Sequence, residues 1–288
     1  MNFGQLLTAM VTPFDKNGEI DYDQTTRLVD HLINNGTEGL VVAGTTGESP
    51  TLSKDEKVKL FEHVVKVVNK RVPVIAGTGS NNTAASIALT KEAEACGVDA
   101  LMLVTPYYNK PDQRGMYEHF SAIAKVTRLP IMLYNIPGRS IVRLNIETIL
   151  RLSEIENIVS VKEATGDLEL AAEIIENTSD DFSVYSGDDS LTLPLLSIGA
   201  AGVVSVASHV VGNEMKNMIE AFYAGNNREA AAAHRKLQPI MHALFTSPSP
   251  TPVKAALQMN GMDTGGVRLP LVELTEEEEN KLGKLLGK

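Results

Sequence analysis

The sequence has little of several features that mark large classes of protein. Among its 288 residues it has one cysteine, Cys96, and no tryptophan. A single cysteine excludes an internal disulfide and any multi-cysteine metal or iron–sulfur site, and it suits a reducing compartment. No apolar stretch approaches the roughly 18 residues that a membrane span needs, and residues 1–15 lack the basic start and apolar core of a signal peptide. We therefore expect a soluble cytoplasmic protein.

Basic and aromatic residues are also too few for a nucleic-acid surface. The chain has 26 Lys and Arg residues against 36 Asp and Glu residues, a formal charge of −10, and only 7 Phe and 7 Tyr residues. Proteins that bind nucleic acids neutralise phosphates with basic side chains and often stack bases on aromatic rings. The six histidines include no pair four residues apart and no His-Glu-x-x-His motif, so metal chemistry has no support in the sequence.

The most informative pattern that is present is a short apolar run followed by small or polar residues and then a helix-like stretch. It recurs about every 25 to 35 residues, as βα units do. Each run is too short for a helix and lacks polar alternation, which is typical of a parallel strand buried on both faces. The eight runs are 7–11, 39–42, 72–76, 100–104, 131–134, 158–161, 182–185 and 202–205.

Eight βα units predict an α/β protein with a closed (β/α)₈ barrel, the TIM-barrel fold, because open doubly wound sheets more often have fewer strands. The stretches at 54–69, 83–95 and 115–127 have apolar residues at three- and four-residue spacing and are predicted to be crossover helices. We assign residues 1–225 to a catalytic barrel and residues 226–288 to a C-terminal helical extension packed on it.

The extension is predicted to contain helices at 227–245, 253–260 and 275–286, with a proline-rich loop at 247–252. Thr275 and Glu278 have the spacing of a capping box at the start of the last helix. The acidic run that begins there is therefore interpreted as a first helical turn that the helix dipole favours, and not as a functional site.

In barrels of this kind the active site lies at the carboxyl ends of the strands. Lys162 directly follows the run at 158–161, where its ammonium group would be desolvated in the barrel mouth. Desolvation lowers the pKa of a lysine and produces the neutral amine that can attack a ketone. The alternative is a lysine that reaches outward to solvent or pairs with Glu163. Tyr134 ends the preceding run, where it could face the same cavity or simply plug the barrel rim.

Other strand ends suggest contacts with a substrate. Gly-Thr-Thr-Gly-Glu at 44–48 supplies flexible backbone and two hydroxyl groups, which suits a small carboxylate, although an ordinary tight loop is the alternative. Gly-Thr-Gly at 77–79 lacks the third glycine of a dinucleotide fingerprint, so we reject a nicotinamide cofactor. Arg139 could hold a carboxylate or form a surface ion pair. The Asp-Asp pair at 188–189 could bind a cation or cap the next helix.

Four longer motifs stand at the ends of predicted strands. They are Gly-Thr-Thr-Gly-Glu-Ser at 44–49, Val-Thr-Pro-Tyr-Tyr-Asn-Lys-Pro at 104–111, Tyr-Asn-Ile-Pro-Gly-Arg at 134–139 and Lys-Glu-Ala-Thr-Gly at 162–166. With these motifs in this order, the chain resembles the dihydrodipicolinate synthase family, which belongs to the superfamily of pyruvate-dependent aldolases that includes N-acetylneuraminate lyase. The similarity extends to the last predicted helix.

The resemblance implies a lyase that condenses pyruvate with L-aspartate 4-semialdehyde in the diaminopimelate route to lysine. Lys162 would form a Schiff base with pyruvate and then an enamine. Tyr134, Thr45 and Tyr108 would relay protons, with Tyr108 reaching in from a neighbouring subunit. The resemblance also implies a homo-oligomer, either a tetramer built from tight dimers or a dimer, and no metal or organic cofactor.

The residues that bind the substrates follow from the same resemblance. Thr46 and the backbone at Val204 would hold the carboxylate of pyruvate. Arg139 would take the carboxylate of the semialdehyde. Gly187 also belongs to the implied substrate-binding set.

One departure concerns regulation. Feedback-sensitive relatives bind lysine at a subunit interface near Ser49, Asn81 and Tyr107, with a glutamate where this chain has Ala85. Lysines also occupy positions 54 and 57, where sensitive bacterial enzymes have histidines. A cationic effector without its carboxylate partner should bind weakly, so we expect little inhibition by lysine.

Two other functions stay open at this point. A sugar-acid aldolase such as N-acetylneuraminate lyase would use the same lysine and tyrosine, but those lyases usually lack an arginine at the position of Arg139. They also tend to have Gly-Ser-Thr-Gly-Glu in place of Gly-Thr-Thr-Gly-Glu. A non-catalytic barrel that binds a keto acid is the second alternative, and the presence of both Lys162 and Tyr134 argues against it.

Overall fold

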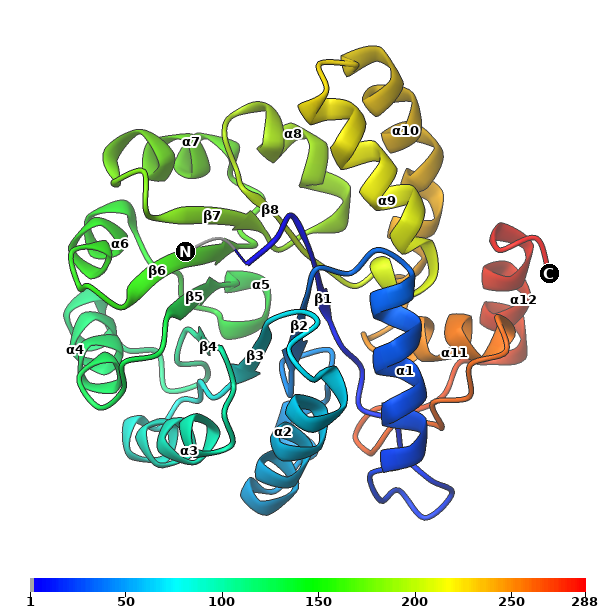
Figure 1. Cartoon of the computed structure of the whole chain (residues 1–288), viewed down its shortest axis with the longest axis horizontal. Coiled ribbons are helices and arrows are strands. Elements are labelled where there is room, and N and C mark those ends of the chain that lie inside the picture. The colour runs from blue at the N-terminus through cyan, green and yellow to red at the C-terminus, as the bar shows by residue number, and fades with distance from the viewer. Residues whose placement is uncertain (1–2) are drawn as a thin grey trace.

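The computed structural model describes residues 3–288. Its centre is a closed barrel of eight parallel strands in chain order, with helices around the outside (Figure 1). This arrangement confirms the fold predicted from the apolar runs. The strands are β1 (Leu6–Ala9), β2 (Gly39–Val42), β3 (Val74–Gly77), β4 (Ala100–Val104), β5 (Ile131–Asn135), β6 (Ile158–Glu163), β7 (Ser183–Ser186) and β8 (Gly202–Ser205).

Helices connect the strands and continue beyond the barrel. Several begin at a polar residue whose side chain accepts a backbone N–H of the first turn, as at Asp21, Ser53 and Asn82, so local capping fixes where they start. None of the helices described in residues 3–288 is long and apolar enough to cross a membrane. They are α1 (Tyr22–Asn34), η1 (Ser49–Thr51), α2 (Lys54–Val68), α3 (Thr83–Ala95), α4 (Gln113–Ala124), α5 (Pro137–Ser140), α6 (Ile146–Ser153), α7 (Leu168–Asn177), η2 (Asp189–Leu191), α8 (Thr192–Ser197), α9 (Ser208–Tyr223), α10 (Asn227–Ala243), α11 (Thr251–Met259) and α12 (Glu276–Leu285).

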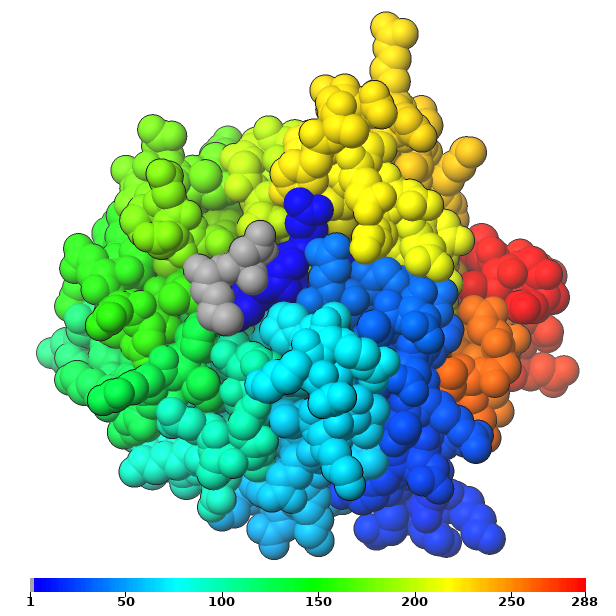
Figure 2. Space-filling view, viewed as in Figure 1, coloured from blue at the N-terminus to red at the C-terminus, as the bar shows by residue number. Residues whose placement is uncertain are grey.

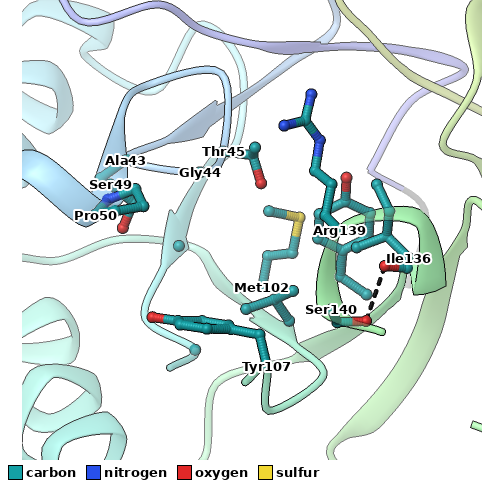
Figure 3. A pocket seen from close by; sticks show the side chains of 14 residues that line it. Ala43, Gly44, Thr45, Ser49, Pro50, Met102, Tyr107, Ile136, Arg139 and Ser140 are labelled. Atoms are coloured by element: carbon teal, nitrogen blue, oxygen red, sulfur yellow. Dashed lines mark hydrogen bonds between the residues drawn. The ribbon is translucent and has the colours of Figure 1, made fainter. Parts of the chain in front are cut away.

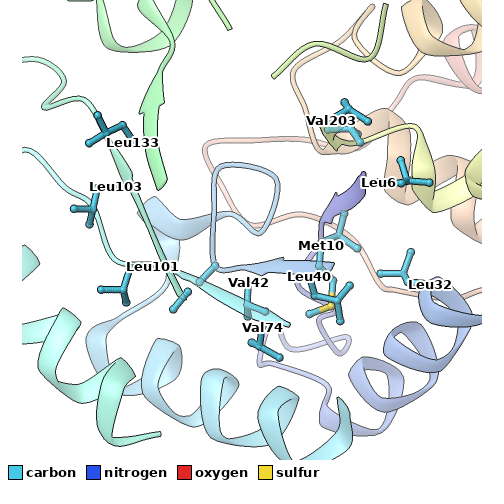
Figure 4. Close-up of a cluster of buried hydrophobic side chains, with 14 of the residues drawn as sticks. Leu6, Met10, Leu32, Leu40, Val42, Val74, Leu101, Leu103, Leu133 and Val203 are labelled. Atoms are coloured by element: carbon cyan, nitrogen blue, oxygen red, sulfur yellow. The ribbon is translucent and has the colours of Figure 1, made fainter. Parts of the chain in front are cut away.

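The strands are apolar on both faces because each face packs against a different layer. Val41 and Ile75 belong to a cluster inside the barrel that also contains Tyr134. Their sequence neighbours, such as Leu40 and Val42, belong to a larger cluster between the strands and the surrounding helices, part of which Figure 4 shows. Successive side chains of a strand point to opposite faces, so a strand buried on both sides has a continuous apolar run.

Strand β6 runs further than its apolar pattern predicted. The predicted run ended at Val161, whereas the strand continues through Lys162 and Glu163. In the sheet register, Lys162 lies opposite Tyr134 of β5 and Tyr185 of β7. The predicted run was ended at the first charged residue, but sheet pairing continues as long as the neighbouring strands supply hydrogen bonds. This extension carries Lys162 into the barrel.

The last three helices lie beyond the barrel, and Figures 1 and 2 show them gathered along one side of it. Helix α10 packs on α9, and α11 packs on both α9 and α12. The loop predicted at 247–252 is wrong at its end because α11 already begins at Thr251. Pro252 lies in the first turn of that helix, where a proline is tolerated since its missing N–H has no partner to lose. The capping box of Thr275 and Glu278 is confirmed.

Candidate active site

Lys162 and Tyr134 lie beside each other at the ends of β6 and β5. The Nζ atom of Lys162 is 4.2 Å from the centroid of the Tyr134 ring, and only 5% and 4% of the two residues is exposed. The outward orientation considered for Lys162 is therefore wrong. Its neighbour Glu163 accepts hydrogen bonds from Asn135 Nδ2 and from the backbone N–H of Thr165 instead of pairing with the lysine.

Burial shifts the pKa values of both groups. It lowers the pKa of Lys162 to about 8, because the charged ammonium is the form that loses hydration; the Asp189 carboxylate raises this pKa and Arg139 lowers it. Burial raises the pKa of Tyr134 to about 12, against the opposite effects of Arg139 and of a hydrogen bond with Thr45. Around neutral pH the pair combines some neutral amine with a protonated phenol, which is a nucleophile next to a proton donor.

A cavity of about 230 Å³ opens at the carboxyl ends of β2 to β5, and Tyr134 forms part of its wall. Figure 3 shows Thr45, Met102 and Arg139 gathered around this space. The wall consists of apolar side chains, small residues and a few polar groups, as expected of a small-molecule site. The lining residues are Ala43, Gly44, Thr45, Ser49, Pro50, Gly77, Gly79, Met102, Val104, Tyr107, Tyr134, Ile136, Arg139 and Ser140.

The loop at 44–48 is held in a compact turn after β2. The N–H of Glu48 donates to the carbonyl of Thr45 at 3.1 Å, and the N–H of Ser49 donates to the carbonyl of Gly44 at 3.2 Å. A Cβ on Gly44 would lie 3.2 Å from Cε of Met102, so a side chain there would require the end of Met102 to shift. Thr45 lines the cavity, whereas Thr46 is buried.

Two more residues of the expected substrate set lie close to Lys162 or in the barrel interior. A Cβ built on Gly187 would be 3.2 Å from Cε of Lys162, so this glycine lies against the lysine side chain. Val204 is 1% exposed and belongs to the same interior cluster as Tyr134. Neither residue is on the lining of the cavity in Figure 3.

Arg139 and Tyr108 occupy more exposed positions. Arg139 lies on the short helix α5 and borders the cavity. The segment that follows α5 is fixed by Asn135, whose amide accepts the N–H of Leu144 and donates to its carbonyl. Tyr108 is 87% exposed and has a φ of +71°, a left-handed conformation that is unusual for a bulky residue. The structure thus brings Arg139, and not Tyr108, to the cavity of this chain.

The Asp-Asp pair splits into two different structural roles. Asp188 accepts the N–H of Ser190 and caps η2, as the helix-cap alternative predicted. Asp189 is buried, and its Oδ2 accepts the backbone N–H groups of Val206 and Ala207 after β8. Its effect on the pKa of Lys162 was missed, because sequence spacing gave no signal that the β7 and β8 ends meet beside the lysine.

The comparisons agree with the geometry. The model of the Dihydrodipicolinate synthetase family matches residues 2–288. A protein of Halalkalibacterium halodurans named 4-hydroxy-tetrahydrodipicolinate synthase 2 is 65% identical over 286 residues, which cover 99% of this chain and 98% of the relative. The 4-hydroxy-tetrahydrodipicolinate synthase of Bacillus subtilis is 60% identical over 288 residues, which cover 100% and 99%.

The chain is also similar to solved structures of dihydrodipicolinate synthases. A dihydrodipicolinate synthase of Bacillus anthracis has a TM-score of 0.99 and 63% identity, with 100% of this chain and 99% of that chain covered. An enzyme of the same kind from Cyanidioschyzon merolae, solved with lysine bound, has a TM-score of 0.96 and 48% identity, with 99% and 97% covered.

The charges around Lys162 generate a prediction for its titration. Labelling by an amine-reactive anhydride should increase as the pH rises through about 8, because only the neutral amine reacts. Arg139→Ala should raise this midpoint and Asp189→Asn should lower it, each by up to about one pH unit. Peptide mass analysis measures the labelling, and exposed Lys110 in the same digest provides the reference. A Lys162 midpoint unchanged in both variants would contradict this electrostatic account.

Proposed function

The chain belongs to the dihydrodipicolinate synthetase family, and from this premise we propose how it condenses pyruvate with L-aspartate 4-semialdehyde. It is a lyase of the diaminopimelate route to lysine, as its relatives with 60% and 65% identity are 4-hydroxy-tetrahydrodipicolinate synthases. The observation that carries the mechanism is the buried Lys162 amine, whose pKa burial lowers to about 8, next to the Tyr134 ring. The cytoplasmic location expected from the sequence stays a prediction.

Lys162 acts as the nucleophile. Its neutral Nζ adds to the keto carbon of pyruvate, and loss of water from the adduct gives an imine. Loss of a methyl proton converts the imine to an enamine, whose carbon attacks the aldehyde of the semialdehyde. The amine of the substrate then displaces Lys162 from the former keto carbon, which closes the ring and frees the enzyme. The positive imine nitrogen accepts the electrons at the enamine step, so the lysine supplies the electron sink.

Tyr134 moves the protons in these steps. Its raised pKa keeps the phenol protonated, so that it can donate to the oxygen that leaves as water and later take a proton back. The hydrogen bond with Thr45 orients the phenol. We place Tyr108 of a neighbouring subunit at the outer end of this relay, because Tyr108 is exposed and left-handed in its own chain. The proposal therefore includes a homo-oligomer, a tetramer of tight dimers or a dimer.

The two substrate carboxylates go to separate places. Thr46, with the backbone near Val204, holds the carboxylate of pyruvate close to Lys162, and Gly187 leaves room for the imine because it lies against the lysine side chain. Arg139 holds the carboxylate of the semialdehyde at the rim of the cavity. A guanidinium suits this task because its planar fork can bind both carboxylate oxygens.

Reduction with borohydride in the presence of pyruvate tests the proposed Schiff base. We expect a reduced pyruvyl adduct on Lys162 and loss of turnover, because reduction fixes the imine as a stable secondary amine. Peptide mass analysis locates the adduct, and Lys254, a second buried lysine, is the internal control. An adduct on another residue, or none, would overturn the mechanism. Turnover with N-acetylneuraminate in place of the semialdehyde would instead favour the sugar-acid aldolase.

The position of Arg139 predicts that its loss impairs the use of the semialdehyde more than the use of pyruvate. Arg139→Ala should lower kcat/KM for the semialdehyde about a hundredfold, equivalent to about 2.7 kcal/mol, because it removes a charged hydrogen-bonding partner. Trapping of the pyruvate imine should change little. Arg143→Ala is the matched control, since Arg143 makes an exposed ion pair with Asp167 at 3.6 Å a few residues away. An equal loss in semialdehyde turnover and in imine trapping, or an equal loss of kcat/KM in both variants, would contradict the proposed role of Arg139.

We also predict weak inhibition by lysine. Ala85 has no carboxylate to offer an effector amine, and Lys54 is paired with Glu92 at 3.1 Å. Initial rates should therefore change little at millimolar lysine. Ala85→Glu should introduce inhibition, because this exposed position in the first turn of α3 can accept a carboxylate without repacking. Strong inhibition of the unmodified protein would contradict the prediction, and Ala85→Ser provides the uncharged control.

A further inference from the structure

A buried ion pair lies outside the residues that the mechanism uses. Lys254 of α11 and Glu48 are joined by a 2.9 Å contact between Nζ and Oε1, and their side chains are only 3% and 1% exposed. Lys254 Nζ also donates to the carbonyl of Gly266 at 2.6 Å. The other carboxylate oxygen of Glu48 accepts the backbone N–H of Arg268 at 2.9 Å. The C-terminal extension thus holds the side chain of Glu48 at both oxygens.

Glu48 is the last residue of the loop that presents Thr45 and Thr46. Its φ is +56°, a left-handed conformation that a residue with a side chain adopts only when its surroundings hold it there. Its N–H donates to the carbonyl of Thr45. A change in the position of Glu48 is therefore transmitted directly to the backbone of the two threonines.

Arg268 extends this hold to neighbouring segments. Its guanidinium donates to the carbonyls of Gly18 and Thr51, each at 2.8 Å, and to Glu56 in the first turn of α2. The ring of Phe14, in the segment after β1, lies 4.4 Å from Arg268 Cζ and 4.2 Å from Lys254 Nζ. Lys254 and Arg268 of the extension therefore contact both the segment after β1 and the segment after β2.

Burying two charges is an inefficient way to stabilise a fold. Desolvation offsets much of the attraction in a buried pair, and an apolar pair of similar size is often at least as stable. A buried pair does, however, tolerate only one arrangement of its partners. The location of this pair, at the end of the loop that carries Thr45 and Thr46, connects that constraint to the active site.

We propose that Glu48, Lys254 and Arg268, which we call the clamp, are positioning residues. They hold the 44–48 loop so that Thr45 contacts Tyr134 and Thr46 contacts the pyruvate carboxylate. This inference rests on the proposed function for its kinetic consequence. We expect the semialdehyde side of the site to be independent of the clamp, because the segment after α5, which carries Arg139, is fixed by hydrogen bonds between Asn135 and Leu144. Loss of the clamp should therefore weaken the use of pyruvate selectively.

Lys254→Met tests the clamp in the full-length protein. It removes the ion-pair partner of Glu48. The KM for pyruvate should therefore rise, and imine trapping should slow by about ten- to a hundredfold. The KM for the semialdehyde should not change. Amide hydrogen exchange in residues 44–49 should become faster without any substrate present. Leu282→Ala, which removes a buried side chain of α12 outside the clamp, is the control for destabilisation of the extension and should produce neither change.

Arg268→Met is a second variant in case Lys254→Met does not fold, since Arg268 is less buried and its backbone contact with Glu48 remains. It should move the same two readouts in the same direction by a smaller factor. Unchanged exchange in the loop, equal effects on both substrates, or the same effects in Leu282→Ala would each overturn the clamp. Failure of the unmodified protein to form the Lys162 adduct would instead overturn the proposed function, while hydrogen exchange would still decide whether the clamp exists.

Discussion

The burial of the Lys162 ammonium is the constraint on which the rest of the site depends. Burial, partly offset by Asp189 and assisted by Arg139, lowers its pKa from 10.5 to about 8, a net cost of about 3 kcal/mol for the charged form. That cost favours the neutral amine that the proposed mechanism requires, and it also requires a rigid barrel that excludes water from the lysine. The two apolar layers on either face of the strands supply this rigidity. Reactivity and packing are therefore two consequences of the same placement at the end of β6.

In the proposed mechanism, two loops at the barrel mouth bind the two substrates, and different residues hold each loop. The proposed pyruvate side uses the 44–48 loop, whose Glu48 contacts Lys254 and Arg268 of the C-terminal extension. The proposed semialdehyde side carries Arg139 on α5, and the segment after α5 is held by Asn135 through its hydrogen bonds with Leu144. In the proposed clamp, the extension acts on the active site although none of its residues lines the cavity.

Local patterns in the sequence predicted the barrel because each βα unit has its own apolar run. The strands at 39–42, 100–104 and 202–205 have the predicted bounds. The extension of β6 to Glu163 could not be predicted in this way, since it depends on pairing with β5 and β7. The Glu48 to Lys254 pair was missed for a related reason: its partners are far apart in the chain, and no periodicity connects them. Motifs identified the chemical groups, whereas long-range contacts determine how they are held.

The two buried lysines show why burial alone does not identify a nucleophile. Burial lowers the pKa of both Lys162 and Lys254 to about 8. The ammonium of Lys254 forms an ion pair with Glu48 and donates to the carbonyl of Gly266, so its protonated form has partners in the folded chain. Within residues 3–288, the Nζ of Lys162 makes no hydrogen bond or ion pair and lies against the Tyr134 ring. The two buried lysines therefore differ in their polar partners, and this difference supports the proposal that Lys162 is the nucleophile.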